Sequence, residues 1–251
     1  MRIRRWRVGE IVPGAIERVT RPVLWHVANS WMQRRVVNDN AADLPDRFDR
    51  TGVAFIHIPK NAGTSISSYL YSEQIGHWRW DQVRQMNPVK YKKWTKFAVT
   101  RNPVERFLSA YDFLVAGGIN NGDEWFARDF VRPHGDINEF LRRLCEHDRF
   151  RESVMQYWHF QPQRSYVCSE HGMCMVDYLV PIEEIFGRMA SLSGGRGSLP
   201  ALNVTPGPRT QRDALNRHSL NVLAELYACD FCLHELAARE SGSVLSAAVF
   251  S

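Results

Sequence analysis

The sequence lacks a long uninterrupted apolar run, and none of its apolar stretches approaches the roughly 20 residues that a membrane-spanning helix needs. It also has no internal repeat and no low-complexity tract. The opening residues, MRIRRWRVGE, contain neither the apolar stretch nor the small-residue cleavage site of a secretory signal. Because 44% of the residues are hydrophobic and 24% are charged, disordered, collagen-like and coiled-coil classes are excluded. We therefore expect a soluble, cytoplasmic protein of 251 residues with a sizeable core.

Cysteines and clustered acidic residues are also scarce. The five cysteines include two closely spaced pairs, Cys168 with Cys174 and Cys229 with Cys232, whose spacing suits a zinc site poorly. Apart from that zinc alternative, we expect core residues or free thiols, and a Cys168–Cys174 disulfide only in an oxidising compartment. No acidic cluster that would hold a metal is evident, so no metal site is expected.

Positive charge is concentrated at the N-terminus. The formal net charge is +5, but residues 1–35 contain eight arginines against two glutamates, so the rest of the chain is close to neutral. A nucleic-acid-binding protein would spread positive charge over its binding face. We therefore expect no nucleic-acid partner, and any anion site in the body must be local.

Residues 1–50 are expected to form a basic N-terminal arm, and residues 51–251 a single main domain. Apolar residues at helical spacing between 16 and 27 favour a helix that packs on the domain, although Pro22 interrupts the pattern. The alternative is peripheral contact of the arm with an acidic membrane, with its tryptophans at the interface. The oligomeric state is not encoded in any pattern that we recognise.

Strand and helix patterns alternate along the main domain. Short apolar runs predict strands at 53–58, 96–100 and 176–180, and helical patterns predict helices at 64–73, from 103 onward, at 137–147 and at 214–238. Asn102 and Pro103 are typical of a helix start. The alternation predicts an α/β fold with a central, P-loop-NTPase-like parallel sheet flanked by helices.

The turn after the first predicted strand carries residues that suit a phosphate. A strand, a tight turn and a helix start bring backbone N–H groups and the positive end of the helix dipole to one point. Gly63 allows close approach of the backbone, Thr64 and Ser65 add hydroxyls, and Lys60 adds a mobile cation. The turn is not a Walker A loop, in which the lysine follows the final glycine. An ordinary β–α turn with a surface lysine is the structural alternative.

A second motif follows the second predicted strand. Arg101 lies where that strand ends, at the edge where ligands of parallel sheets collect. Ser109 lies about 140° around the following helix from Val104, away from the apolar stripe. A guanidinium and a hydroxyl near a helix N-terminus suit a phosphate dianion, although such pairs are also common on ordinary surfaces.

The segment HIPKNAGTS, at 57–65, resembles the signature HIPKxAGTS of the carbohydrate-type sulfotransferases. Residues 100–111 resemble the second signature of that superfamily, RNPxxRxxSxY, and weaker similarity extends the resemblance over about 53–236. The resemblance implies 3′-phosphoadenosine 5′-phosphosulfate (PAPS) as the donor, with its 5′-phosphosulfate at the first turn and its 3′-phosphate at the second. The implied donor-binding residues are Lys60, Asn61, Ala62, Gly63, Thr64, Ser65, Arg101 and Ser109, and Arg209 is added from its position alone.

The implied reaction, an in-line sulfuryl transfer to a hydroxyl, needs charge neutralisation on the departing phosphate and a base for the acceptor proton. Lys60 is expected to perform the first task. His77, His159 and Glu183 are the candidates for the base, whereas His57 is expected to be a core residue.

The predicted function is therefore a PAPS-dependent sulfotransferase that acts on a glycan or glycolipid-like acceptor. Two alternatives remain open: an ATP-dependent, nucleotide kinase-like transferase, and a non-catalytic member that binds a nucleotide or a glycan.

Overall fold

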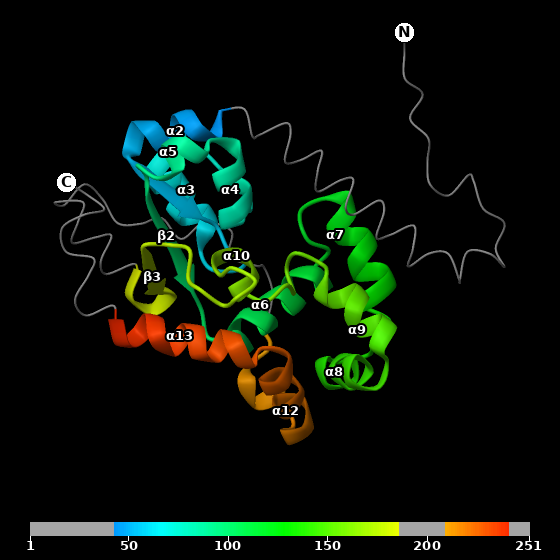
Figure 1. The fold of residues 1–251 in the computed structure, drawn as a ribbon. Coiled ribbons are helices and arrows are strands. Elements are labelled where there is room, and N and C mark those ends of the chain that lie inside the picture. The colour runs from blue at the N-terminus through cyan, green and yellow to red at the C-terminus, as the bar shows by residue number, and fades with distance from the viewer. Residues whose placement is uncertain (1–42, 186–208, 241–251) are drawn as a thin grey trace, which may run out of the picture. The chain divides into compact units, whose positions relative to one another are not determined.

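The computed structural model describes residues 43–185 and 209–240 (Figure 1). The compact unit that contains them begins at Asp43, ahead of the expected domain boundary at residue 51. The physical reason is helix α2 (Leu44–Thr51), whose buried Leu44 and Phe48 pack it against the first strand and the helix that follows. The expected arm helix lies outside the described residues.

Three parallel strands form the described sheet, in the order β1 (Val53–Ile56), β2 (Thr95–Thr100) and β3 (Tyr178–Pro181). Every residue of β1 is buried, which explains why this strand is a continuous apolar run. Helices flank the sheet, so the predicted α/β class with a parallel sheet is confirmed for the described residues. Because the strands are parallel, their carboxyl ends lie at one edge, where ligands of such sheets collect.

The helices around this edge carry the two predicted turns. Helix α3 (Gly63–Tyr71) follows β1, and α6 (Pro103–Val115) follows β2. The Asn102 side chain accepts hydrogen bonds from the amides of Val104 and Glu105, at 3.0 and 3.4 Å, which confirms the predicted helix start.

Further helices lie between and after the strands in the described part of the chain. They are α4 (Trp80–Met86), α5 (Pro88–Tyr91), α7 (Asn121–Phe126), the π-helical segment η2 (Ala127–Val131), α8 (Ile137–Glu146), α9 (Asp148–Met155), α10 (Arg164–Val167), the 3₁₀ segment η3 (Arg212–Ala214), α12 (Arg217–Leu226) and α13 (Ala228–Glu240). None of the described helices is long and apolar enough to cross a bilayer.

The helix predicted for 214–238 is wrong as one element, because the chain breaks at Tyr227. Tyr227 ends α12 with φ −120° and ψ 24°, and its buried hydroxyl donates to the carbonyl of Phe160 at 2.6 Å. The break turns α13 along β2 and β3. It thereby places Asp230 beneath the site described below.

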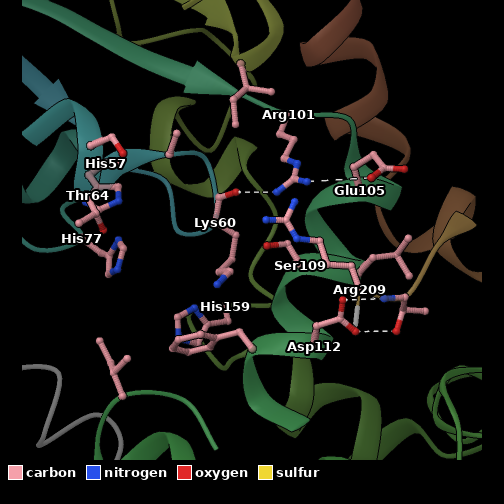
Figure 2. Close-up of a pocket in the computed structure, with 18 of the residues that line it drawn as sticks. His57, Lys60, Thr64, His77, Arg101, Glu105, Ser109, Asp112, His159 and Arg209 are labelled. Carbon is pink, nitrogen blue, oxygen red and sulfur yellow. Dashed lines mark hydrogen bonds and ion pairs between the residues drawn. The ribbon is translucent and has the colours of Figure 1, made fainter. Parts of the chain in front are cut away.

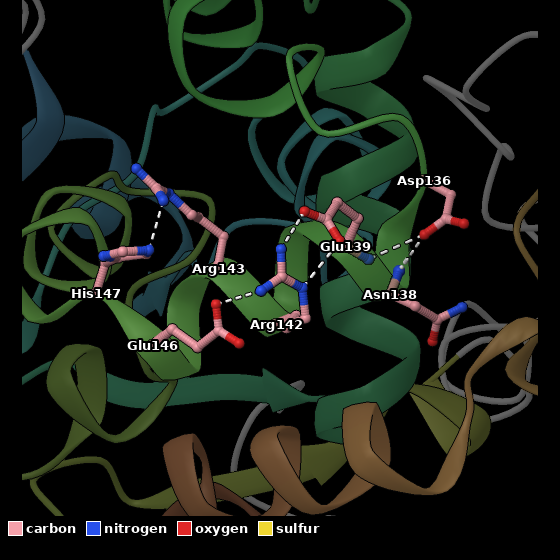
Figure 3. A network of polar contacts seen from close by, with 7 residues as sticks. All are labelled: Asp136, Asn138, Glu139, Arg142, Arg143, Glu146 and His147. Atoms are coloured by element: carbon pink, nitrogen blue, oxygen red, sulfur yellow. Dashed lines mark hydrogen bonds and ion pairs between the residues drawn. The ribbon is translucent and has the colours of Figure 1, made fainter.

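Helix α8 illustrates how the outer helices divide their faces. Phe140, Leu141 and Leu144 are buried, whereas Arg142 pairs with Glu139 and Glu146 on the exposed face (Figure 3). Exposed pairs of this kind contribute little to stability. We therefore assign this network a surface role only.

Candidate functional site

A cavity of about 560 Å³ opens at the carboxyl edge of the sheet (Figure 2). The structure brings nearly all of the predicted site residues to it, although they come from segments far apart in the sequence. Those that line it are Lys60, Ala62, Gly63, Thr64, Ser65, His77, Arg101, Ser109, His159, Glu183 and Arg209. Figure 2 shows Lys60 between two groups: the histidines on one side, and Arg101, Ser109 and Arg209 on the other.

The turn that bears Lys60 is tightly bent and held from behind. Lys60 (φ 71°) and Ala62 (φ 58°) both adopt the left-handed conformation, which is unfavourable for residues with a side chain. Two arginines hold the carbonyls of this turn: Arg106 Nε donates to Pro59 at 3.0 Å, and Arg101 Nη1 donates to Lys60 at 3.3 Å. These contacts stabilise the bend and fix the direction in which α3 begins.

Gly63 is required by a neighbouring side chain. A Cβ atom at this position would lie 1.7 Å from Nε2 of His57, whose ring covers the start of α3. His57 is held there because its Nδ1 is 2.8 Å from the carbonyl of Gly76. The side chain of His57 is buried and hydrogen-bonded as expected, yet it also lines the cavity.

Asn61 differs from the other residues of the turn, because it does not line the cavity. Its side chain is buried, and Nδ2 donates to the carbonyl of Val99 at 2.7 Å and to Oε1 of Gln163 at 2.8 Å. These bonds tie the first turn to the end of β2. The side chain of Asn61 therefore shapes the turn from behind the cavity.

Gln163 links the same turn to the second motif. Its Oε1 accepts from the amide of Arg101 at 3.0 Å, and its Nε2 donates to the carbonyl of Arg101 at 2.8 Å. Asp230 in turn accepts from the amides of Gln163 and Arg164, at 2.7 and 2.9 Å. One buried network thus fixes the two turns relative to each other.

The late segment that bears Arg209 is anchored to α6. Oδ2 of Asp112 accepts from the amide of Thr210 at 2.9 Å, and Oδ1 accepts from its hydroxyl at 2.5 Å. Because Thr210 follows Arg209 directly, this contact holds Arg209 at the cavity.

Lys60 is partly desolvated, which changes its titration. Burial, with repulsion from Arg101 as the next cause, lowers the pKa of Lys60 to about 8. Its Nζ lies 3.9 Å from the ring centroid of Phe113, which gives the ammonium a favourable cation–π contact.

Three histidine rings form the opposite wall. The rings of His57 and His77 are 4.0 Å apart, and those of His77 and His159 are 6.4 Å apart, between centroids. Burial lowers the pKa of His57 and of His159 to about 4, and burial with repulsion from the other two rings lowers that of His77 well below its usual value. All three rings are therefore neutral at pH 7.

Glu183, the third candidate base, lies at the exposed rim of the cavity. Its side chain is 58% exposed, and Oε2 is 4.0 Å from Nε2 of His234. Among the described residues, no group of three or more histidine, cysteine or acidic side chains is arranged to hold a metal. All five cysteines are free thiols, which confirms one of the two expectations, and none of them is buried, so the alternative of core cysteines is wrong.

The sequence reasoning missed four polar residues of this site: Arg106, Asp123 and Gln163 support it from behind, and Asp112 lines the cavity itself. Asp123 is buried in α7, with Oδ1 at 3.4 Å from Nε2 of His159. Arg106 is the second arginine of the RNPxxRxxSxY motif, so the resemblance was the available signal for that residue. No local pattern pointed to Asp112 or Asp123.

A sequence model of the Sulfotransferase family matches residues 46–190, which is more than half of the chain. No curated protein and no solved structure matches significantly. The matched segment contains β1, β2 and β3, both turns, and all three histidines of the cavity wall. The chain therefore belongs to the sulfotransferase family.

Proposed function

We propose that the protein transfers a sulfuryl group from PAPS to a hydroxyl of a glycan or glycolipid-like acceptor. The observation that carries this proposal is the position of Lys60 in the cavity, between an arginine-lined side and a histidine-lined side. Such a layout separates a polyanionic donor from an acceptor that must lose a proton. The lysine lies where the two meet.

The residues present suit an adenosine bisphosphate. The start of α3 has no side-chain cap, and Gly63, Thr64 and Ser65 of its first turn line the cavity, where a helix N-terminus suits a phosphate. Arg101, Ser109 and Arg209 supply two guanidinium groups and a hydroxyl for a second phosphate. The cavity volume of about 560 Å³ is in the range of small-molecule sites, roughly 300–1,000 Å³.

The transfer step needs little covalent chemistry from the protein. A bond forms between the acceptor oxygen and sulfur, while the bond between sulfur and the 5′-phosphate oxygen breaks and its electron pair stays on the phosphate. Lys60 stabilises the charge that develops on that oxygen, and a histidine accepts the acceptor proton. The products are a sulfate ester and adenosine 3′,5′-bisphosphate.

Labelled-sulfate transfer from PAPS to a panel of neutral and acidic glycans and glycolipids tests the proposal. We expect Lys60→Ala and Arg101→Ala each to abolish transfer without unfolding the protein. Lys92→Ala and Arg149→Ala, two exposed positions away from the cavity, are the matched controls and should keep full activity. Full transfer by both cavity variants would overturn the proposal.

A thermal-shift comparison separates the two alternatives. Adenosine 3′,5′-bisphosphate should raise Tm more than ATP does, because the second phosphate site is separate from the first turn. A larger shift with ATP would favour a kinase-like transferase. Binding of the bisphosphate without transfer to any acceptor would favour a non-catalytic role.

A further inference from the structure

We propose that Asp123 is a positioning residue for His159, and that His159 is the base that accepts the acceptor proton. This inference rests on the proposed sulfuryl transfer. Nε2 of His159 lies at an ion-pair distance of 3.4 Å from Oδ1 of Asp123, and neither ring nitrogen has a hydrogen-bond partner among the described residues. One side of the ring is therefore directed to a carboxylate, and the other nitrogen is available for a proton.

Asp123 is buried, with only 1% of its surface exposed, and several hydrogen bonds hold its carboxylate in place. Its Oδ2 accepts from Asn120 Nδ2 at 2.8 Å and from the amide of Ile119 at 3.2 Å, and its Oδ1 accepts from the hydroxyl of Tyr157. Gly118 leaves room for it, since a Cβ there would lie 2.1 Å from Cβ of Asp123. Burial of a carboxylate is costly, and this set of donors offsets the cost. We infer that the buried negative charge has a functional role.

The charge state of the pair supports the same assignment. Burial alone would raise the pKa of Asp123, but the contacts with His159, with Tyr157 and with the amide of Ile119 lower it. The carboxylate is therefore ionised at neutral pH. A carboxylate behind an imidazole fixes the orientation of the ring and stabilises the imidazolium that forms when the ring accepts a proton.

His159 needs such support because burial opposes a proton on its ring, and two nearby cations add to that effect. The groups that face it are Asp123 from α7, Tyr157 from its own segment, Arg106 from α6, Lys60 from the first turn, and the rings of His77 and His57. Lys60 and Arg106 oppose a proton on His159, whereas Asp123 favours it. Of these neighbours, Asp123 carries the only charge that stabilises a proton on His159. Without the carboxylate, that stabilisation would be lost.

The other two histidines lack this arrangement. In residues 43–185 and 209–240, no carboxylate lies within ion-pair distance of His57 or His77. His57 already uses Nδ1 on the carbonyl of Gly76, and its ring packs on His77. The geometry therefore distinguishes His159 from its neighbours.

The test compares Asp123→Asn with Tyr157→Phe, which removes one hydrogen bond to the same carboxylate but leaves the charge. NMR titration of the imidazole C–H signals, assigned with His159→Gln, reports the pKa of His159. We expect D123N to lower that pKa and Y157F to change it less. An unchanged pKa of His159 in D123N would overturn the inference, and this readout does not depend on any acceptor.

Activity gives the second readout. We expect D123N to reduce single-turnover transfer by roughly 100-fold or more, with the Kd for adenosine 3′,5′-bisphosphate within about twofold of the wild-type value. The double variant D123N/H159Q should be little slower than H159Q, because the two residues act as one unit. Transfer by D123N at the wild-type rate would also overturn the inference.

Because Asp123 also supports the 118–120 segment, Asp123→Glu is measured in parallel. D123E keeps the charge and should recover part of the rate that D123N loses. Equal transfer rates of D123E and D123N would indicate that Asp123 has a purely structural role. If the wild-type protein transfers no sulfuryl group at all, the proposed function fails. The pKa comparison still decides whether Asp123 acts on His159.

Discussion

Asn61 and Gln163 form a buried amide pair, with Nδ2 of Asn61 donating to Oε1 of Gln163 at 2.8 Å. The same Gln163 forms two hydrogen bonds with the backbone of Arg101, at 3.0 and 2.8 Å. The two turns that we assign to the two ends of PAPS are therefore joined through one side chain. A change in this amide should affect both ends together.

We expect Gln163→Glu to weaken binding of adenosine 3′,5′-bisphosphate by roughly tenfold or more, because a carboxylate cannot donate to the carbonyl of Arg101 and a buried unpaired acceptor costs about 1–3 kcal/mol. Isothermal titration calorimetry measures the affinity. The control is Gln161→Ala, whose side chain makes one exposed bond to the carbonyl of Gln156. Equal affinity of Q163E and wild type would show that the link does not matter for binding.

The close approach of His57 to Gly63 gives a second prediction. Gly63→Ala should destabilise the fold by about 1–3 kcal/mol, because the added Cβ overlaps the His57 ring and one of them must move. Urea denaturation measures the free energy of unfolding. The double variant G63A/H57A should recover part of this loss of stability, because the alanine at position 57 leaves room for the added Cβ. If G63A and G63A/H57A lose the same stability, the overlap with His57 is not the cause.

The sheet and the donor side of the cavity could be predicted because their signals are local. The apolar run before Pro59 and the Asn102–Pro103 helix start each lie within a few consecutive residues. The structure confirms the first as strand β1 and the second as the start of α6. Parallel strands then bring the two turns to one edge without further information. Sequence pattern and chain topology were therefore sufficient to predict that Lys60 and Arg101 line the same cavity.

The base side could not be predicted in the same way. Helix α7 has six residues, which is too short for a helical period to stand out. The contact between Asp123 and His159 joins segments that no pattern relates, so the sequence did not distinguish His159 from His77, and Glu183 stayed a third candidate. The break at Tyr227 was hidden for a different reason: a buried tyrosine suits the apolar face of a continuous helix.

The desolvated ammonium of Lys60 should lower the stability of the folded protein, although the same charge favours binding of the anionic donor. Its pKa falls to about 8 in the folded protein, against about 10.4 when unfolded. The unfolded chain therefore binds more protons between these values, so this group makes stability rise with pH across that window. Below pH 8 the full penalty applies, and Lys60→Met should raise Tm there while abolishing transfer.

Thermal unfolding at pH 7 and at pH 10 measures this effect. The gain in Tm from K60M should be larger at pH 7 and should shrink at pH 10, where the lysine is mostly neutral in the folded protein. Lys92→Met, at an exposed position, is the control and should show no such trend. A lower Tm for K60M at pH 7 would contradict a charge that is costly to bury.

The contact between Asp112 and Thr210 predicts how Arg209 is kept at the cavity. Asp112→Ala removes both bonds to Thr210, so Arg209 should lose its fixed position and the Kd for adenosine 3′,5′-bisphosphate should rise by roughly tenfold. If Asp112 acts through Arg209, D112A/R209A should bind no more weakly than R209A alone. Glu139→Ala, in the exposed network of α8, should leave the affinity unchanged. Additive losses in the double variant would instead mean that Asp112 affects the ligand by a separate route, such as its own negative charge at the cavity wall.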